Sequence, residues 1–247
     1  KAYFKCMYET VTSILAKAGT IDHPYLKAGE SGKKAVIVIT SNRGLAGGYN
    51  SNIVKLVTRG DFKKDDVAIY ALGKKGRDSF ARYGYDIRLE NESIVEEPTY
   101  ADAMVLSNKV LEAYAKGEIR EIYLAYTAFK NTVVHEPTLI KLLPVEAEAM
   151  KPDANIVNND NKAPMNFEPE EEEALDMIIP KYVTSLIFGG LVEAVASENG
   201  ARMQAMDSAT SNADEMIGKL SLQYNRARQG SITQELTEII AGANAIN

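Results

Sequence analysis

Residues 35–50 read AVIVITSNRGLAGGYN, an apolar run that is followed by a glycine-containing loop. Its first five residues, Ala35 to Ile39, form a continuous apolar run rich in β-branched side chains. Such a run is typical of a strand that is buried on both faces. The loop Ser41 to Asn50 follows with three glycines, and a helical pattern comes directly after it. We therefore expect a strand, a tight turn and a helix, which together open an α/β domain.

The same alternation continues on the C-terminal side of this stretch. Further strands are expected at residues 67–72, 121–126 and 133–143, and helices at 51–58, 75–83 and 101–116. Strands that alternate with helices indicate a mainly parallel sheet. Pro137 interrupts the last strand and therefore favours an edge position for it.

The pattern divides the chain into four segments. We expect residues 1–18 to be the end of an N-terminal helix, residues 33–145 an α/β domain, residues 146–168 an exposed linker and residues 169–247 one long helix. The first segment carries apolar residues at alternating steps of three and four, which is a helical spacing. Its first residues, Lys1 to Tyr8, lack the long apolar core of a secretory signal.

The C-terminal segment predicts a helix that cannot be stable alone. A stripe with steps of three and four runs along it, formed by Met206, Ala209, Ala213, Ile217, Leu220, Tyr224 and Ala227. We call the first six of these residues the seam. Because a single helix cannot bury its own stripe, the seam predicts a coiled-coil partner, and its small alanines allow a close approach.

Composition excludes several classes of protein. The 247 residues carry 34 acidic and 28 basic side chains, for a net charge of −6. An acidic chain without a basic block is a poor nucleic-acid binder. The sequence shows no apolar run long enough to suggest a membrane span. The single cysteine, Cys6, cannot form an internal disulfide and fits a reducing, intracellular compartment.

The loop Ser41–Asn50 lies where a Rossmann fold or a P-loop binds phosphate. Its glycines are Gly44, Gly47 and Gly48, which match neither the dinucleotide nor the Walker spacing, and no Walker lysine follows. The pattern favours a tight turn over a nucleotide site. His23 and His135 have no metal-ligand spacing and are interpreted as surface histidines, so we predict no catalytic residue, metal or cofactor.

The end of the long helix mixes long polar side chains with apolar ones. The polar members are Arg226, Arg228, Gln229, Thr233, Gln234 and Glu235, and they alternate with Ile232 and Leu236. This mixture indicates a second protein surface beyond the coiled-coil partner.

Two stretches of this helix resemble a known family. Residues 227–243, ARQGSITQELTEIIAGA, and residues 196–216, ASENGARMQAMDSATSNADEM, are similar to the C-terminal helix of the gamma subunit of F-type ATP synthases. The loop SNRGLAGGYN is similar to the first strand-to-helix loop of that family, in which it is not a nucleotide site. The resemblance implies a Rossmann-like α/β domain inserted between N- and C-terminal helices that form an antiparallel coiled coil.

The resemblance also implies a function. The chain is expected to be a central rotor shaft, non-catalytic by itself, that couples ion flow to ATP synthesis or hydrolysis at the beta subunits. Its implied partners are the hexamer of alpha and beta subunits, the epsilon subunit and the membrane c-ring, with no nucleic acid and no direct membrane insertion. The motif positions imply contacts with the beta subunits at Arg228, Gln229, Thr233 and Glu235, and a second level at Arg202.

Two departures from the family qualify this expectation. Family members begin with a longer first helix, so we expect more helix before Lys1. The regulatory cysteine-bearing insertion of the chloroplast type is lacking, which favours a bacterial enzyme on the cytoplasmic face of the plasma membrane. The alternatives are a Rossmann-type nucleotide-binding enzyme and a passive coiled-coil tether.

Overall fold

The computed structural model describes residues 23–27, 29, 31–145 and 171–246. The expected first helix at 1–18 and linker at 146–168 lie outside the described residues, so the predicted domain boundaries there stay predictions. The chain separates into two units, residues 1–202 and 203–247.

The first unit is built on one five-stranded sheet. Its strands are β1 (Lys33–Ile39), β2 (Val67–Leu72), β3 (Asp86–Asn91), β4 (Ile119–Phe129) and β5 (His135–Leu143). Their order is β3-β2-β1-β4-β5, and every neighbouring pair is parallel except β4 and β5. The expected mainly parallel α/β sheet is confirmed, and the proline-containing strand β5 lies at an edge.

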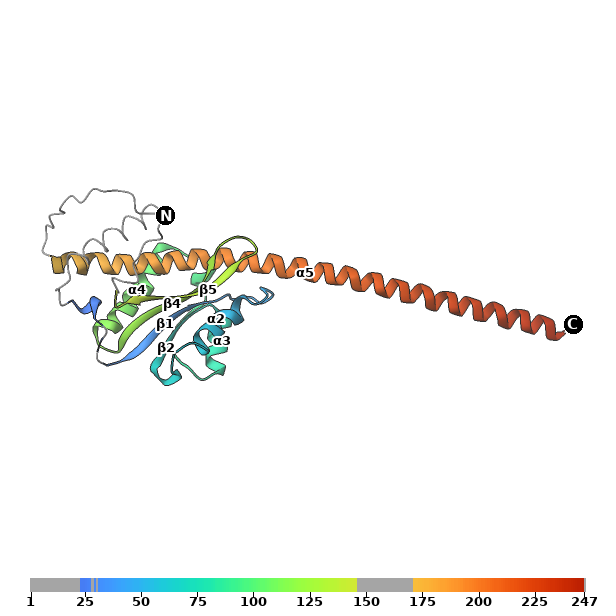
Figure 1. The fold of residues 1–247 in the computed structure, drawn as a ribbon, viewed down its shortest axis with the longest axis horizontal. Coiled ribbons are helices and arrows are strands. Elements are labelled where there is room, and N and C mark those ends of the chain that lie inside the picture. Colours follow the sequence, from blue (N-terminus) through green and yellow to red (C-terminus); the bar gives the residue numbers. More distant parts are fainter. Residues whose placement is uncertain (1–22, 28, 30, 146–170, 247) are drawn as a thin grey trace. The chain divides into compact units, whose positions relative to one another are not determined.

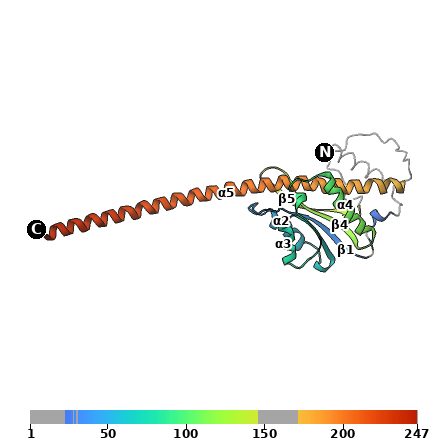
Figure 2. The same ribbon diagram turned by 180° about the vertical axis from the view of Figure 1, so that it is seen from behind.

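Helices cover both faces of the sheet (Figure 1). Two of them, α2 (Tyr49–Thr58) and α3 (Lys74–Arg82), pack on one face, where Val36 and Val38 of β1 point. The other face carries α4 (Tyr100–Ala115) and the first part of α5 (Glu171–Ile246), and it receives Ile37 and Ile39. Figure 2 shows the same two layers from behind. Short 3-10 turns lie at η1 (Pro24–Leu26), η2 (Lys64–Asp66) and η3 (Ser93–Val95).

Burial explains why β1 is apolar along its whole length. Ala35 to Ile39 are at most 1% exposed, because helices cover both sides of this central strand. At the edge, β3 has an alternating pattern in which Ile87 and Leu89 pack against the core while Arg88 and Glu90 are exposed. Strand β3 was not predicted from the sequence, because two apolar residues among charged ones give a weak signal.

Helix α5 contains 76 residues, which corresponds to a length of about 114 Å. Within the first unit it buries Leu175, Ile179, Val183, Ile187 and Leu191 against the sheet. Part of the helix is long and apolar enough to cross a membrane by length and composition alone, which the sequence analysis did not recognise. Half of that part is buried inside the structure, so its apolar residues serve the core.

Close approach of α5 to the sheet depends on a glycine. A Cβ atom added at Gly190 would lie 2.9 Å from Cδ2 of Leu124 on β4. A methyl group at this position would therefore force the buried Leu124 side chain or the helix to shift. The absence of a side chain at Gly190 thus leaves room for Leu124 between α5 and β4.

Candidate functional site

The loop after β1 uses its own polar groups instead of leaving them for a ligand. The hydroxyl of Thr40 accepts a 2.8 Å hydrogen bond from the N–H of Gly76, and the Asn42 carboxamide oxygen accepts one of 3.0 Å from the N–H of Lys74. Both donors belong to the first turn of α3, the helix that follows β2, whereas the phosphate in a Rossmann fold binds at the helix that follows the first strand, which here is α2. Protein side chains already occupy these two donors.

The loop is also closed on itself. The Asn50 side-chain oxygen accepts a 2.9 Å hydrogen bond from the N–H of Ser41, and the Ser41 hydroxyl donates one of 2.6 Å to the Arg43 carbonyl. Leu45 at the tip has φ 62°, a left-handed conformation that tight turns require. These bonds describe a structural turn, in line with the interpretation of the glycine spacing. No cluster of metal-binding side chains is found among the described residues.

Tyr49, the first residue of α2, connects this loop to the long helix. Its hydroxyl donates a 3.2 Å hydrogen bond to the carbonyl oxygen of Ala194 on α5. The side chain is 5% exposed, and this burial raises the pKa of the Tyr49 phenol above its ordinary value of 10.0, with Glu198 adding to the rise. The strand-to-helix loop is therefore an anchor for α5.

The hairpin of β4 and β5 supplies a second anchor. The Ser197 hydroxyl donates a buried 3.0 Å hydrogen bond to the carbonyl oxygen of Thr127. One turn later, Arg202 forms a 2.6 Å ion pair with Glu198 on the same helix. Arg202, a predicted partner contact, is thus partly buried and held in place by its own helix.

The histidines contradict the expectation of surface side chains. His23 is 4% exposed, its Nδ1 accepts a hydrogen bond from the N–H of Tyr25, and its Nε2 lies 3.2 Å from a carboxylate oxygen of Asp176. His135 packs on α5, and both of its ring nitrogens are buried. Each histidine lies where a loop or strand meets α5, a proximity that sequence spacing does not reveal.

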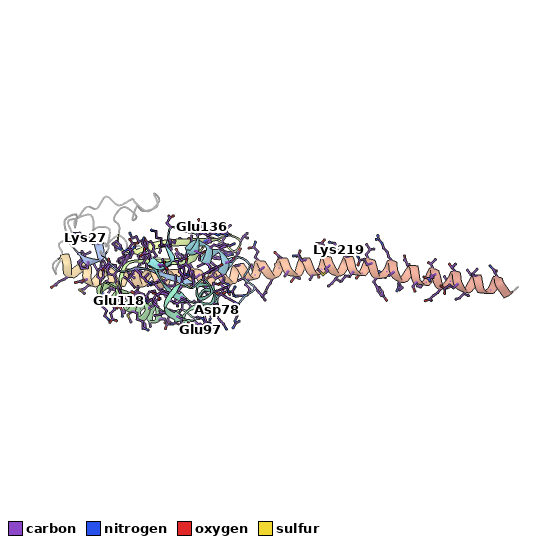
Figure 3. All side chains as sticks on the ribbon, turned by 90° about the horizontal axis from the view of Figure 1, so that it is seen from below. Lys27, Asp78, Glu97, Glu118, Glu136 and Lys219 are labelled. Carbon is purple, nitrogen blue, oxygen red and sulfur yellow. The ribbon has the colours of Figure 1, made fainter. Side chains whose placement is uncertain are left out.

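The second unit consists of α5 from Met203 onward, and its described side chains are exposed except for that of Ala205, which is half-buried. All six seam residues lie in it: Met206, Ala209, Ala213, Ile217, Leu220 and Tyr224. The four large ones are 47–67% exposed. Figure 3 shows side chains around Lys219 projecting from this length of helix in several directions. An apolar stripe of this length is the kind of surface that binds a partner.

The predicted polar contacts follow the seam and are also exposed. Gln229, Thr233 and the next turn are linked along the helix: the Thr233 hydroxyl donates to the Gln229 carbonyl at 2.8 Å, and Thr237 donates to Thr233. Arg228 and Glu235 have no hydrogen-bond or ion-pair partner within the described part of the chain. The four residues thus present polar groups on several sides of one helix.

A second apolar face lies among these polar groups. It comprises Ile232, Leu236, Ile239 and Ile240, each 48–67% exposed. The step from Ala227 to Ile232 is five residues, whereas the seam has steps of three and four. Because each residue turns the helix by about 100°, the extra residue moves the apolar face around the helix axis. The sequence analysis named Ile232 and Leu236 but missed Ile239 and Ile240, and the break in spacing is the signal that identifies them.

Comparison with known proteins identifies a family in which a long helix is combined with a Rossmann-like domain. A family model described as ATP synthase matches residues 1–246. The ATP synthase gamma chain of Lachnoclostridium phytofermentans is 61% identical over 249 residues, which cover 100% of this chain and 86% of that protein. The chain belongs to the ATP synthase gamma-chain family. A gamma chain of Acetobacterium woodii, named as sodium ion specific, is 39% identical over 259 residues. This match covers 100% of this chain and 86% of that protein.

Solved structures of the gamma-chain family's assemblies share the fold. A chain in the Euglena gracilis mitochondrial ATP synthase, in rotational state 3, matches with a TM-score of 0.64 and 17% identity, covering 99% of this chain and 90% of that one. A chain of the Tetrahymena thermophila mitochondrial ATP synthase central stalk and c-ring matches with a TM-score of 0.57 and 22% identity. The match covers 81% of this chain and 86% of that one. At such identities the likeness concerns the fold.

Proposed function

We propose that this chain is the central rotor shaft of an F-type ATP synthase. It couples ion flow through the membrane sector to ATP synthesis or hydrolysis at the beta subunits by rotation. The observation that carries the proposal is the geometry of α5 in a gamma-chain family member. One helix is anchored to an α/β domain at one end and exposes an apolar seam along its other half.

The seam supports a coiled coil with the N-terminal helix. Its members repeat with steps of three and four, and Ala209 and Ala213 leave room for a second helix at close distance. The partner segment in this proposal is the helix that ends near residue 18. A two-helix shaft resists twisting better than one exposed helix, which suits a part that carries torque.

The tip of α5 is the proposed contact with the catalytic subunits. Arg228, Gln229, Thr233 and Glu235 point in different directions around the helix, and the beta subunits surround it in different states. Polar groups form hydrogen bonds in only some of those states, whereas apolar contacts discriminate less. Arg202, paired with Glu198, forms the proposed second level of contact nearer the α/β domain.

The remaining partners follow from the same role. The α/β domain is the foot of the shaft, where the epsilon subunit and the c-ring dock, and the chain is part of a membrane-associated complex. Its place is the cytoplasmic face of a bacterial plasma membrane, without insertion into the bilayer. The proposed absence of catalysis is supported by the loop Ser41–Asn50, whose glycine spacing matches neither nucleotide motif and whose Ser41 and Asn50 side chains bond within the loop.

Co-purification tests the proposal directly. The chain is co-expressed with the alpha and beta subunits of its own organism and isolated through a tag on beta. The proposal expects a complex with alpha, beta and this chain in the ratio 3:3:1, the stoichiometry that the family resemblance implies. Recovery of alpha and beta without the chain, or with a substoichiometric amount of it, would contradict the role as a shaft.

A further inference from the structure

The hairpin of β4 and β5 has a rigid tip that lies on α5. Phe129 and His135 form the last pair of the antiparallel ladder. In the turn beyond them, the side-chain oxygen of Asn131 accepts hydrogen bonds from the N–H groups of Val133 at 2.9 Å and Val134 at 2.7 Å. A turn whose backbone donors are satisfied by one side chain keeps a defined shape.

The His135 ring occupies the space where Gly200 of α5 lacks a side chain. A Cβ atom added at Gly200 would lie 2.6 Å from Cε1 and 3.1 Å from Nε2 of His135. Both ring nitrogens are buried and have no hydrogen-bond partner among the described residues. The ring is therefore held by shape, between Gly200 and the Phe129 ring at a centroid distance of 6.0 Å.

Two further contacts place the same helix face against the hairpin. The Ser197 hydroxyl donates to the Thr127 carbonyl at 3.0 Å, and a carboxylate oxygen of Glu193 accepts from the N–H of Phe129 at 3.4 Å. Residues 193, 197 and 200 are spaced by four and three, so they lie on one side of the helix. Rotation of α5 about its own axis would break all three contacts together.

We propose that this hairpin is a clasp that fixes the rotational position of α5 on the sheet. Within it, His135 and Gly200 are the positioning pair through which torque passes between the shaft and the foot. The proposal rests on the proposed rotor function. The clasp lies in the last turns of α5 that belong to the first unit, so it acts where the shaft leaves the α/β domain.

Glycine-to-alanine exchanges on the same helix test the clasp. Gly200→Ala places a methyl group against the His135 ring, whereas Gly218→Ala meets nothing within 4 Å and is the matched control. Each variant is assembled into the whole ATP synthase in vesicles, and ATP-driven ion transport and ATP hydrolysis are measured together. For Gly200→Ala we expect the ions transported per ATP to fall by roughly threefold or more, and no change for Gly218→Ala.

A second exchange separates the clasp from a general loss of structure. His135→Ala removes the ring that fills the space at Gly200 without adding bulk to the helix. It is expected to lower the ions transported per ATP, as Gly200→Ala does, while the assembled complex still hydrolyses ATP. Normal coupling of Gly200→Ala or of His135→Ala would overturn the proposal. If Gly200→Ala does not assemble, Ser197→Ala is used, and normal coupling in that variant would equally count against the clasp.

Failure of the rotor function itself would look different. In that case the unmodified chain would not assemble with the alpha and beta subunits, or its complex would hydrolyse ATP without ion transport. Failure of the clasp alone leaves the unmodified complex fully coupled.

Discussion

The Tyr49 hydroxyl and the Ala194 carbonyl oxygen lie 3.2 Å apart and form a buried hydrogen bond across 145 positions of sequence. This bond connects the loop after the central strand to the long helix. The shaft and the foot are thus joined through the loop that occupies the nucleotide-binding position in Rossmann folds.

Replacement Tyr49→Phe keeps the ring in the core and deletes only the hydroxyl. We expect the free energy of unfolding to fall by about 0.5–1.5 kcal/mol, because a buried hydrogen bond between α2 and α5 is lost. Urea unfolding of the full chain, followed by circular dichroism, measures the change. Tyr224→Phe is the control, since that ring is 67% exposed and its hydroxyl makes no buried bond. Equal effects of the two exchanges would contradict the anchoring role.

Alkaline pH is expected to weaken the same contact. Burial raises the pKa of Tyr49 above the ordinary 10.0, so the folded state holds the phenolic proton more tightly than the unfolded state. The contribution of Tyr49 is complete below about pH 10 and is lost as the pH rises further. Above that pH, the unmodified chain should lose up to about 1.4 kcal/mol more per pH unit than Tyr49→Phe. Parallel pH profiles of the two unfolding free energies would refute this.

The seam can be tested by overpacking. Ala209→Leu adds bulk where a second helix is expected to lie close, at a cost of roughly 1–3 kcal/mol. The melting temperature of the complex with alpha and beta should fall. Ser211→Leu is the control, because two residues further on the side chain points about 200° around the helix. An unchanged melting temperature for Ala209→Leu would count against a close helix pair.

The polar tip is expected to contribute to turnover and less to assembly. The double exchange Arg228→Ala/Gln229→Ala removes groups on two sides of the helix. ATP hydrolysis of the complex should slow by about three- to tenfold, a rise of roughly 0.7–1.4 kcal/mol in the barrier. Lys219→Ala is the control, since Lys219 pairs with Glu215 on its own helix. Wild-type turnover of a normally assembled double variant would show that the tip acts without these groups.

The isolated chain is expected to bind no nucleotide at the loop Ser41–Asn50. Calorimetric titration of the full chain with ATP, and separately with NAD, is expected to give only heats of dilution. The alpha–beta complex with ATP serves as the positive control. Stoichiometric binding to the chain alone would instead favour the alternative of a Rossmann-type enzyme.

Local pattern was enough to predict most of the sheet. The β-branched run Ala35–Ile39 indicated a strand buried on both faces, and it is the central strand of the sheet. Pro137 indicated an edge, because proline cannot donate to a neighbouring strand, and β5 is an edge strand. The strand β3 was missed because it lies at an edge and carries only Ile87 and Leu89 as apolar signals. A register shift between these two residues places them against the clusters on opposite faces of the sheet.

Contacts between distant segments could not be predicted in the same way. The seam and the polar tip follow from spacing within one helix, and the structure leaves both exposed for partners. The bonds of Tyr49 with Ala194 and of Ser197 with Thr127, by contrast, depend on how α5 crosses the sheet. In the sequence, Gly200 only indicates a position of low helix propensity. The reason for a glycine there becomes visible in the structure, where the His135 ring occupies the space of a side chain.

Rotation of this chain inside the complex with alpha and beta can be observed directly. The α/β domain of this chain is labelled with a visible probe, and the complex with alpha and beta is fixed to a surface through beta. On addition of ATP, the rotor function predicts that the probe turns continuously in one direction, at a rate that follows ATP hydrolysis. A complex that hydrolyses ATP at full rate while the probe stays still, or moves without a preferred direction, would contradict it.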